Sequence, residues 1–401
     1  MHVGVGYGDD PNSLTAGLSA AREALSKAGR SDPCDFAFLF YTARHDAQAL
    51  RNAVVSVIGN VRIVGGGAAG VISDSRFGYA GDQVALACIW LEDAKCEFLA
   101  EGGLIESEER AGERLGRRLL SINVTHDSPV MLFYDAIDNT RGDVRILAAT
   151  RLLAGIERTM NFLPDLTGAG MMGDYMCSPT PQWCGGETPE SHCALALAFS
   201  GNIRIDSAIM HGCKPATSYY TVTKTDGQVI LEIEARPAVS FIEERLGPSI
   251  PPETWPFFLI LGINRGDKWG RFDADNYASR LCLAIDKERG GIVMFEPDIV
   301  AGMEVQIMYR SLEHDYMKPK IEKVFDGLNG RRPVFAVYID CAGRAAGYGG
   351  IDLEDAVILQ KTVANRVPIL GMYTGVEIAK VQGRPCGLDW TGVFCLFSVQ
   401  R

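Results

Sequence analysis

The sequence predicts an α/β fold (mixed α+β) made of two α/β domains with internal βαβ-like repeats and mixed sheets. The main observation is that three stretches of the chain share one layout, namely residues 36–70, 130–170 and 333–377. Each begins with an apolar strand, continues at helical spacing, and returns through a second apolar segment to glycine or polar residues. Each is about as long as one βαβ unit. Because the layout recurs, we expect duplicated α/β halves that face one another.

The last stretch shows the pattern most clearly. An uncharged run of β-branched and aromatic residues predicts a strand that is buried on both faces. The strand covers residues 334–339, the helix that follows covers 352–366, and the second strand covers 367–372. The second strand leads into Tyr373, Thr374 and Glu377. Ligands of open α/β sheets bind beyond the carboxyl ends of the strands, so we expect a small-ligand site at this edge.

The remaining elements follow from the same patterns. Within the first two stretches we expect strands at residues 36–41, 61–64 and 130–134, and helices at 47–58 and 144–158. Elsewhere we expect strands at 3–7, 84–90, 96–100, 194–199, 203–210, 257–263, 291–296 and 305–309, and helices at 14–28, 107–120, 238–246 and 313–328. An Asp-Gly pair at 226–227 predicts a β-hairpin within residues 219–234. We expect one domain over residues 1–235 and a second over 236–401.

The composition argues against several classes of protein. The chain has 401 residues, of which 47% are hydrophobic and 22% charged, as in ordinary globular proteins. Its net charge of −11 argues against nucleic acid or an anionic membrane surface as a partner. No apolar run is long enough to span a bilayer, and the start does not resemble a signal peptide. The 11 cysteines include no CxxC pair, which favours a reducing compartment. We therefore expect a cytoplasmic protein.

Four motifs in a fixed order give the chain a resemblance to a known family. They are Gly66-Gly67-Ala68-Ala69-Gly70 after a strand, Gly212-Cys213-Lys214-Pro215 before the hairpin, Cys341-Ala342-Gly343-Arg344, and residues 368–375 before Glu377. In this order the chain resembles the FIST proteins, which combine a FIST N with a FIST C domain. It departs from their usual pattern at Val376, which separates Gly375 from the glutamate, and at Asp389, where the final strand is commonly entered through asparagine. A carboxylate in place of an amide loses two donors and adds a charge.

The resemblance implies a sensory module that binds small molecules such as amino acids and works alongside signalling kinases or cyclases. Some stand-alone members look like haem-binding nitric-oxide sensors that act on a partner histidine kinase. The sequence shows neither a kinase nor a receiver pattern of its own. We therefore expect any signal to pass through another protein, such as a histidine kinase.

The motifs supply the candidate ligand-binding residues. These are Gly66, Gly67, Ala68, Cys341, Arg344, Tyr373, Thr374 and Glu377. The Arg344 guanidinium can bind a carboxylate through paired hydrogen bonds, or it can form a structural salt bridge with Asp340 or Asp352. Glu377 would suit an ammonium group, so that Arg344 and Glu377 together would match the two ends of an amino acid.

Two further chemistries remain as alternatives. Cys341 is a candidate nucleophile or redox sensor, although no histidine lies near it in the repeat to act as a base, and it can equally be a small residue that fills a strand end. Among the six histidines, His211 is best placed as an axial haem ligand, with Cys213 as the alternative and His45 as second choice. We expect a binding protein and not an enzyme, with haem binding and cysteine-dependent catalysis as the alternatives.

Overall fold

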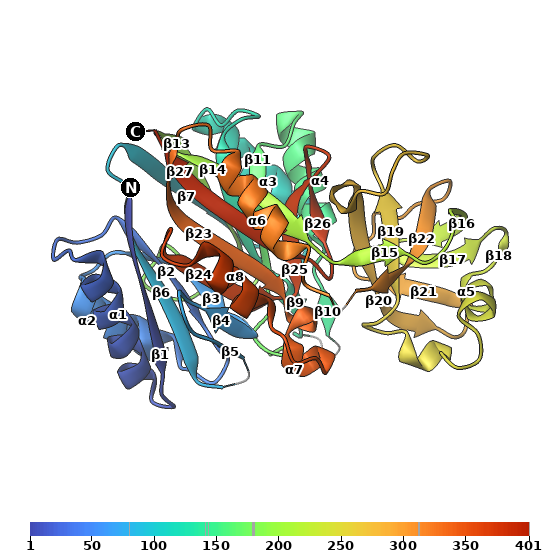
Figure 1. Ribbon diagram of the computed structural model, residues 1–401, viewed down its shortest axis with the longest axis horizontal. Helices are drawn as coiled ribbons and strands as arrows, with labels where there is room; N and C mark the ends of the chain where they lie inside the picture. The colour runs from blue at the N-terminus through green and yellow to red at the C-terminus, as the bar shows by residue number, and fades with distance from the viewer. Residues whose placement is uncertain (80, 141, 143, 179–180, 312, 401) are drawn as a thin grey trace.

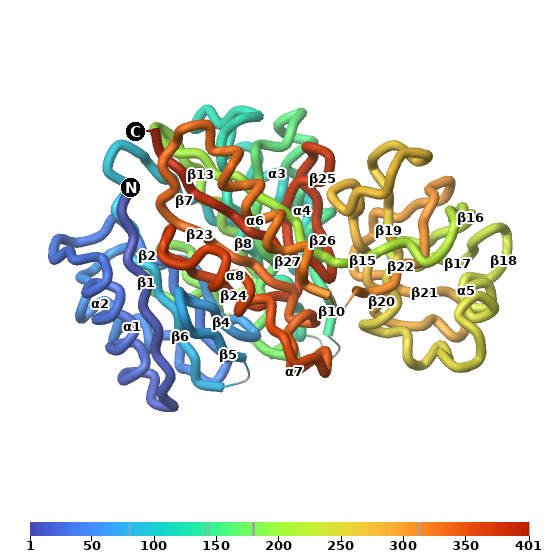
Figure 2. Tube along the Cα trace, viewed as in Figure 1, coloured from blue at the N-terminus to red at the C-terminus, as the bar shows by residue number. Residues whose placement is uncertain are grey.

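The computed structural model describes residues 1–79, 81–140, 142, 144–178, 181–311 and 313–400, and its helices and mixed sheets confirm the predicted α/β class. Three α/β units surround a common core, and a β-barrel lies at one end of the long axis (Figure 1). The first unit holds residues 2–90, the second 94–201, and the third 204–210 together with 317–399. The barrel, residues 213–310, is inserted into the third unit. Figure 2 shows that both chain termini lie at the end of the molecule away from the barrel.

The first unit covers one face of its sheet with two helices. Its elements are β1 (His2–Asp9), α1 (Ser13–Ala28), β2 (Phe36–Tyr41), α2 (Ala47–Ile58), β3 (Arg62–Gly67), β4 (Gly70–Ile72), β5 (Phe77–Tyr79) and β6 (Gln83–Trp90). The strands β2 and β3 form a parallel pair that α2 connects. Asn12 and Asp46 cap the two helices, because their side chains accept hydrogen bonds from the N–H groups of Thr15 and Ala49.

Alternate glycines in β1 let α1 lie directly against the sheet. A Cβ atom on Gly6 would collide with the carbonyl oxygen of Ala20, and Gly4 and Gly8 meet the helix backbone in the same way. The glycine-rich start of the chain is therefore explained by close packing between a helix and a strand.

The second unit repeats this arrangement. Its elements are β7 (Ala94–Glu101), α3 (Glu108–Ser121), β8 (Pro129–Asp135), β9 (Ile137–Asp138), β10 (Arg145–Ile146), α4 (Ala149–Met160), β11 (Asp165–Met171), β12 (Gln182–Cys184) and β13 (Ala194–Gly201). The strands β8 and β11 form the parallel pair. The helix predicted at residues 144–158 begins only at Ala149, because Arg145 and Ile146 pair with β9 as a short strand.

The third unit contains the motif-rich end of the chain. Its elements are β14 (Arg204–Met210), α6 (Met317–Asp326), β23 (Arg332–Cys341), α7 (Ala346–Gly349), α8 (Asp355–Val363), β24 (Ile369–Thr374), β25 (Val376–Val381), β26 (Arg384–Leu388) and β27 (Gly392–Val399). The strands β23 and β24 form the parallel pair, as the sequence pattern predicts. The helices α6 and α8 are shorter than the ranges predicted for them, 313–328 and 352–366.

The three units are interlocked in a ring. Each unit sends the strand that follows its parallel pair into the sheet of the next unit. The strand β4 of the first unit pairs with β24, β25 of the third unit pairs with β11, and β12 of the second unit pairs with β3. The main sheet of each unit therefore combines strands from distant parts of the chain, and the three predicted repeats form one body.

Aromatic side chains fill the centre of the ring. The first strand of each parallel pair contributes one phenylalanine, which is Phe38 from β2, Phe133 from β8 and Phe335 from β23. The ring centroid of Phe38 lies 6.1 Å from that of Phe133 and 6.4 Å from that of Phe335. Such aromatic contacts stabilise a core by about 0.5–1.5 kcal/mol each beyond the burial of their surface. The repeated strand pattern thus builds the shared core.

The barrel closes through six strands. Its elements are β15 (Cys213–Pro215), β16 (Tyr220–Asp226), β17 (Val229–Ile233), β18 (Arg236–Pro237), α5 (Ala238–Leu246), β19 (Ile260–Asn264), β20 (Tyr277–Asp286), β21 (Gly291–Met294) and β22 (Glu304–Arg310). The order β16-β17-β21-β20-β19-β22 closes on itself, because β22 pairs with both β19 and β16. The predicted hairpin is the antiparallel pair of β16 and β17.

Two carboxylates join the barrel to the three units. Glu296 of the barrel accepts hydrogen bonds from the N–H groups of Ala149 and Thr150, at 2.9 and 2.8 Å, at the start of α4. A negative group at this end of a helix satisfies free N–H groups and opposes the helix dipole. In the other direction, Asp389 of the third unit accepts from the N–H of Leu281 in β20 at 2.9 Å. These polar contacts accompany apolar packing across the joint, where Leu281 and Phe295 of the barrel share a cluster with Trp390.

Candidate functional site

A small cavity lies where the second and third units meet the barrel. We call it the Trp390 cavity, and its volume is about 170 Å³. Its aromatic walls are Tyr175, Phe257, Phe295, Tyr348 and Trp390, and its other lining residues include Met172, Leu281, Cys341, Thr374 and Asp389. Most of its surface is apolar, with a few polar groups at defined positions, which is typical of small-molecule sites.

Three parts of the fold converge on this cavity. The strands β23 and β24 end at Cys341 and Thr374, so the sheet edge predicted from the sequence supplies two lining residues. The turn after β26 brings Asp389 and Trp390, and the segment after β11 brings residues 172–177. The barrel contributes Phe257, Leu281 and Phe295. The cavity exists only because the barrel is docked on the ring.

Trp390 lies between a glycine and an arginine. A Cβ atom on Gly343 would come within 2.9 Å of the indole ring, so only glycine leaves room for the ring at that position. The Arg310 guanidinium lies 3.5 Å from the centroid of the ring, and it donates to the carbonyl of Phe257 at 2.6 Å. Arg310 forms no ion pair with a carboxylate of the described residues. A cation that has no anionic partner in the described part of the chain therefore lies beside the cavity.

Three lining residues adopt strained backbone conformations. Cys177, Phe257 and Trp390 have φ angles of 54°, 63° and 53°, in the left-handed region that favours glycine. For side chains of this size such conformations cost about 1–3 kcal/mol each and persist only where the surroundings impose them. Strain of this kind is common at ligand sites, and three of the cavity's residues carry it.

Asp389 is the most unusual polar group of the cavity. Its side chain is 1% exposed, and one carboxyl oxygen, Oδ2, accepts the N–H of Leu281 at 2.9 Å. The other oxygen, Oδ1, is buried and has no hydrogen-bond partner among the described residues. Burial raises the pKa of Asp389 to about 8, although Arg280 opposes the shift. A buried acceptor without a partner is costly, so Asp389 is poised to accept a donor from a ligand.

Glu377 is a second buried acid close to Asp389. Its Oε2 atom accepts the N–H of Thr391 at 3.2 Å, and its Oε1 atom has no hydrogen-bond partner in the described part of the chain. Burial raises the pKa of Glu377 well above its usual range, and the neighbouring charge of Asp389 raises it further. Each of these two acids disfavours the ionisation of the other. A nearby cation would stabilise the ionised forms of both.

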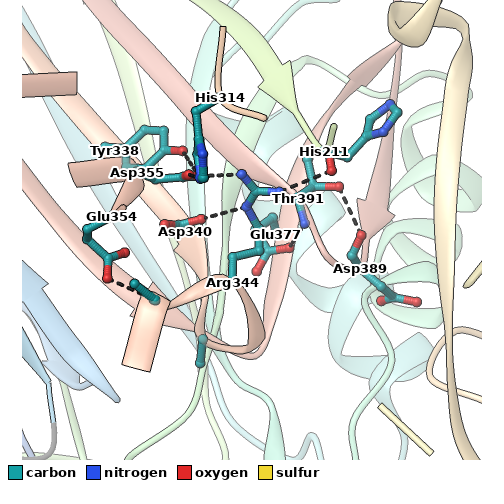
Figure 3. A network of polar contacts seen from close by, with 12 residues as sticks. His211, His314, Tyr338, Asp340, Arg344, Glu354, Asp355, Glu377, Asp389 and Thr391 are labelled. Atoms are coloured by element: carbon teal, nitrogen blue, oxygen red, sulfur yellow. Dashed lines mark hydrogen bonds and ion pairs between the residues drawn. The ribbon is translucent and has the colours of Figure 1, made fainter. Parts of the chain in front are cut away.

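Arg344 lies in a buried ion-pair network (Figure 3). Its Nε atom donates to Asp340 at 3.1 Å, and its terminal nitrogens donate to Asp355, to the hydroxyl of Tyr316 at 3.0 Å and to the carbonyl of His211 at 3.1 Å. Burial alone would lower the pKa of Arg344, but Asp355 and the other acidic groups around it raise it well above its usual value. Of the two roles expected for Arg344, the structure shows the salt bridge, made with Asp340 and Asp355.

Asp355 is the centre of this network and was missed by sequence reasoning. It also contacts Nε2 of His314 at 3.0 Å and accepts from the hydroxyl of Tyr338 at 3.0 Å. Burial raises the pKa of Asp355, but Arg344 and His314 outweigh this and lower it to about 2. In the sequence Asp355 lies in the first turn of a predicted helix, where acidic residues are common, so its position did not indicate a functional role.

The other predicted residues have different locations. Tyr373 is buried and packs edge-on against Tyr79, with ring centroids 5.5 Å apart, and Thr374 donates to the carbonyl of Gly170. Gly66 and Gly67 end the strand β3 in the first unit, and Ala68 belongs to the shared core. The structure thus brings Cys341 and Thr374 onto the cavity wall and leaves these three first-unit residues away from it.

The surroundings of His211 do not fit a haem site. Its Nε2 atom donates to the carbonyl of Ala274 at 2.9 Å, and its Nδ1 atom accepts the N–H of Cys213 at 3.0 Å. Burial lowers the pKa of His211 to about 4, so the ring is neutral. Cys213 is itself buried, and its thiol contacts the carbonyl of His211 at 3.4 Å. Since both ring nitrogens are already hydrogen bonded, neither is free to bind iron.

Comparison with known proteins agrees with the resemblance seen in the sequence. The FIST N domain model matches residues 35–236 and the FIST C domain model matches residues 238–380, so the chain belongs to the FIST family. An uncharacterized protein of Mycobacterium bovis is 23% identical over 413 residues and covers 99% of both chains. An uncharacterized protein of Mycobacterium tuberculosis is 25% identical over 194 residues, which are 48% of this chain and 50% of its own.

Among solved structures, a cyanuric acid hydrolase from A. caulinodans matches 50% of this chain and 71% of its own, with a TM-score of 0.26 and 11% identity. A likeness of this size carries no argument about function. Among the described residues, no helix has the length and apolar character needed to cross a membrane. The same residues contain no cluster of three or more side chains suited to holding a metal ion.

Proposed function

We propose that this FIST-domain protein is a sensor that binds a small organic amine in the Trp390 cavity and reports the bound state to a separate protein. The observation that carries the proposal is the Oδ1 atom of Asp389, which is buried on the wall of an aromatic cavity without a hydrogen-bond partner among the described residues. A ligand that supplies an N–H donor there would remove the cost of the unsatisfied oxygen.

The chemistry of the walls favours a cationic donor. The faces of aromatic rings attract cations, and Tyr175, Phe257, Phe295, Tyr348 and Trp390 surround the cavity. An ammonium group would also allow Asp389 to ionise, because a nearby positive charge offsets the desolvation that raises its pKa. The amine therefore gains both a hydrogen bond and a charge pair.

Arg310 adds a preference for ligands with an acidic group. Its guanidinium stacks on Trp390 and forms no ion pair with a carboxylate of the described residues. Burial lowers the pKa of Arg310, and an anion beside it would oppose that effect. An amino acid with an apolar side chain offers an ammonium group to Asp389 and a carboxylate to Arg310. In this assignment Arg310 takes the carboxylate role first expected of Arg344.

Binding at this position can be converted into a signal. Asp389 ties the third unit to the barrel through the N–H of Leu281, and it is the same residue that the ligand would engage. A ligand that favours one position of the barrel relative to the ring shifts the population toward that position. A partner such as a histidine kinase would then recognise the altered surface.

Calorimetric titration tests this proposal with three matched ligands. We would compare an apolar amino acid, the amine that lacks its carboxyl group, and the acid that lacks its amino group. The proposal expects the amino acid to bind most tightly, the amine next, and the acid not at all. Asp389→Asn should abolish amine binding, whereas Asp352→Asn, which changes an exposed acid of the third unit, should leave it unchanged. Binding of the acid alone, or unchanged binding to Asp389→Asn, would refute the proposal.

Cysteine-dependent catalysis has one supporting observation, which is that Cys341 lines the cavity. Burial raises the pKa of the Cys341 thiol well above its usual value, and Glu377 raises it further. The thiolate that catalysis needs is therefore disfavoured. We propose binding as the function, and turnover of any cavity ligand that requires Cys341 would overturn that choice.

A further inference from the structure

We propose that Cys184 and Cys193 form a dithiol–disulfide redox site at the seam between the first and second units. Their sulfur atoms lie 2.9 Å apart, and both residues are free cysteines. A disulfide bond is about 2.0 Å long, so the two sulfur atoms need to approach each other by less than the length of one bond. Neither cysteine lines the Trp390 cavity.

The backbone around the pair is held from both sides. Cys184 ends β12, where it pairs with Val64 of the first unit, and Cys193 directly precedes β13 of the second unit. The carbonyl of Cys193 accepts from the N–H of Asp135 at 3.0 Å, and the next residue after Cys184, Gly185, donates to Ile63 at 3.1 Å. A disulfide would therefore join strands of two neighbouring sheets with little movement of the backbone.

The segment between the two cysteines forms a surface loop. Gln182 and Glu190 exchange backbone hydrogen bonds of 2.8 and 2.7 Å across its base, which brings the two cysteines together. Residues 186–188 and 190–191 are exposed, whereas Cys184 is 8% and Cys193 is 1% exposed. Both sulfur-bearing side chains lie at the margin of the loop but belong to the shared core, so the loop and the end of β12 must open to expose the thiols.

The oxidation balances with a small external disulfide as the oxidant. The thiolate of Cys184, the more exposed of the two, attacks one sulfur of the external disulfide, whose S–S bond breaks and releases one thiolate. The thiolate of Cys193 then attacks the sulfur of Cys184 in the mixed disulfide and expels the second external thiolate. The two protons lost by Cys184 and Cys193 end on the two released thiols. Both cysteines together lose two electrons, and the external disulfide gains them.

Burial and pairing set the conditions for this reaction. The hydrogen bond to Cys193 raises the pKa of the Cys184 thiol, and burial adds to the effect. The reduced pair is therefore slow to react in the closed loop, and the reaction depends on loop opening. The half-buried residues Cys96 and Cys177 provide an internal comparison, since neither contacts a second cysteine among the described residues.

The redox site has a consequence for the cavity that rests on the proposed function. The segment before β12 contributes Tyr175 and Cys177 to the cavity wall. A disulfide at Cys184, the last residue of β12, would restrain the end of that segment that leads into β12. The chemistry of the pair itself does not depend on the proposed function, so its test can fail or succeed separately.

Peptide mapping of the full chain tests the proposal. The protein would be equilibrated in mixtures of oxidised and reduced glutathione, alkylated, and digested with proteases that include one cleaving after glutamate. Cleavage after Glu187 or Glu190 separates Cys184 from Cys193. We expect the two fragments to remain linked under oxidising mixtures, to be lighter by two hydrogen atoms than the reduced pair, and to separate on reduction. Alkylation of both cysteines at every ratio would overturn the proposal.

Two variants sharpen the result. Cys184→Ser should remove the linkage and leave Cys193 fully alkylated, whereas Cys96→Ser, a matched control on β7, should keep it. A linkage of Cys193 that survives in Cys184→Ser would show that another cysteine is its partner and would refute the assignment. Should Cys184→Ser fail to fold, fragment spectra of the linked wild-type peptides identify the cysteine that is joined to Cys193.

Discussion

Replacement of Asp389 by asparagine is expected to stabilise the protein at neutral pH while it abolishes amine binding. The residue is buried, one of its oxygens has no hydrogen-bond partner among the described residues, and burial raises its pKa to about 8. Asparagine has nearly the same shape, keeps an acceptor for the N–H of Leu281, and carries no charge. A residue kept for binding at the expense of stability should show both effects together.

The magnitude follows from the difference in pKa between the folded and unfolded states. An unfolded aspartate has a pKa of about 3.9, whereas that of folded Asp389 is about 8, so the folded state holds its proton more tightly. The contribution of Asp389 to stability is therefore greatest below pH 4 and falls by about 1.4 kcal/mol per pH unit until the folded carboxyl ionises near pH 8. The expected gain in Asp389→Asn is about 1.5 kcal/mol at pH 5 and about 4 kcal/mol at pH 7.

Urea unfolding of both proteins at pH 5, 6, 7 and 8 measures this difference. The gain should grow with pH up to about 8 and then level off. Asp352→Asn serves as the control, because this side chain is exposed and its substitution should give a small difference that does not follow pH. A variant that is less stable than the wild type by the same amount at every pH would show that Asp389 is ionised, and it would refute the reasoning.

Three further predictions concern the network, the cavity wall and the redox pair. Arg344→Met should lower the free energy of unfolding, measured by urea unfolding, by about 3–5 kcal/mol, because buried Asp340 loses its ion-pair partner and Asp355 keeps only His314 and Tyr338. Gly343→Ala should displace the ring of Trp390, change its fluorescence and cost about 1–3 kcal/mol. Oxidation of Cys184 and Cys193 should stabilise the protein by about 2–3 kcal/mol, seen as a higher urea midpoint without reductant.

Each of these three predictions has a matched control. Arg117→Met removes an exposed arginine of α3 and should change stability by less than about 0.5 kcal/mol. Gly349→Ala places a Cβ atom 3.8 Å from the side chain of Ile351, an ordinary contact distance, and should leave the fluorescence unchanged. In the redox comparison Cys96→Ser should behave like the wild type. Equal effects in a control and its partner variant would contradict the structural explanation for that residue.

The strands and helices could be predicted because their signals are local. The runs at β2, β8 and β23 are all rich in apolar and aromatic residues, and each is followed by polar residues or glycine. The three repeats can therefore be seen in the sequence. Their arrangement was not visible, because it depends on β4, β12 and β25 pairing with sheets of other units. Pairing between distant strands leaves no pattern in a single sequence.

The site could be predicted only in part for the same reason. Cys341 and Thr374 end strands that the sequence places at one edge, and the structure puts both on the cavity wall. Phe257 and Phe295 come from the inserted barrel, whose docking no local pattern indicates. Asp389 was noticed only as a departure from the family's usual asparagine, and its importance depends on burial that the sequence does not show.

Arg344 shows how a strong local signal can mislead. An arginine after a buried strand is well placed to bind a carboxylate, and the sequence offered Asp340 or Asp352 as its alternative partners. In the structure it pairs with Asp340 and with Asp355, a residue on the helix α8 that was not considered. Arg310 lies beside the cavity without an acidic partner among the described residues, but it ends a barrel strand that carried no functional signal.

Titration of the wild-type protein with an apolar amine at pH 6, 7 and 8 tests the central claim most directly. If the amine binds to ionised Asp389, binding must release the proton that the free protein holds below pH 8. The account therefore predicts affinity that rises about tenfold from pH 6 to 7 and about fivefold from pH 7 to 8, together with proton release that calorimetry in two buffers detects. Affinity that is constant or falls with rising pH would contradict it, because the ligand would then be recognised by a protonated carboxyl group.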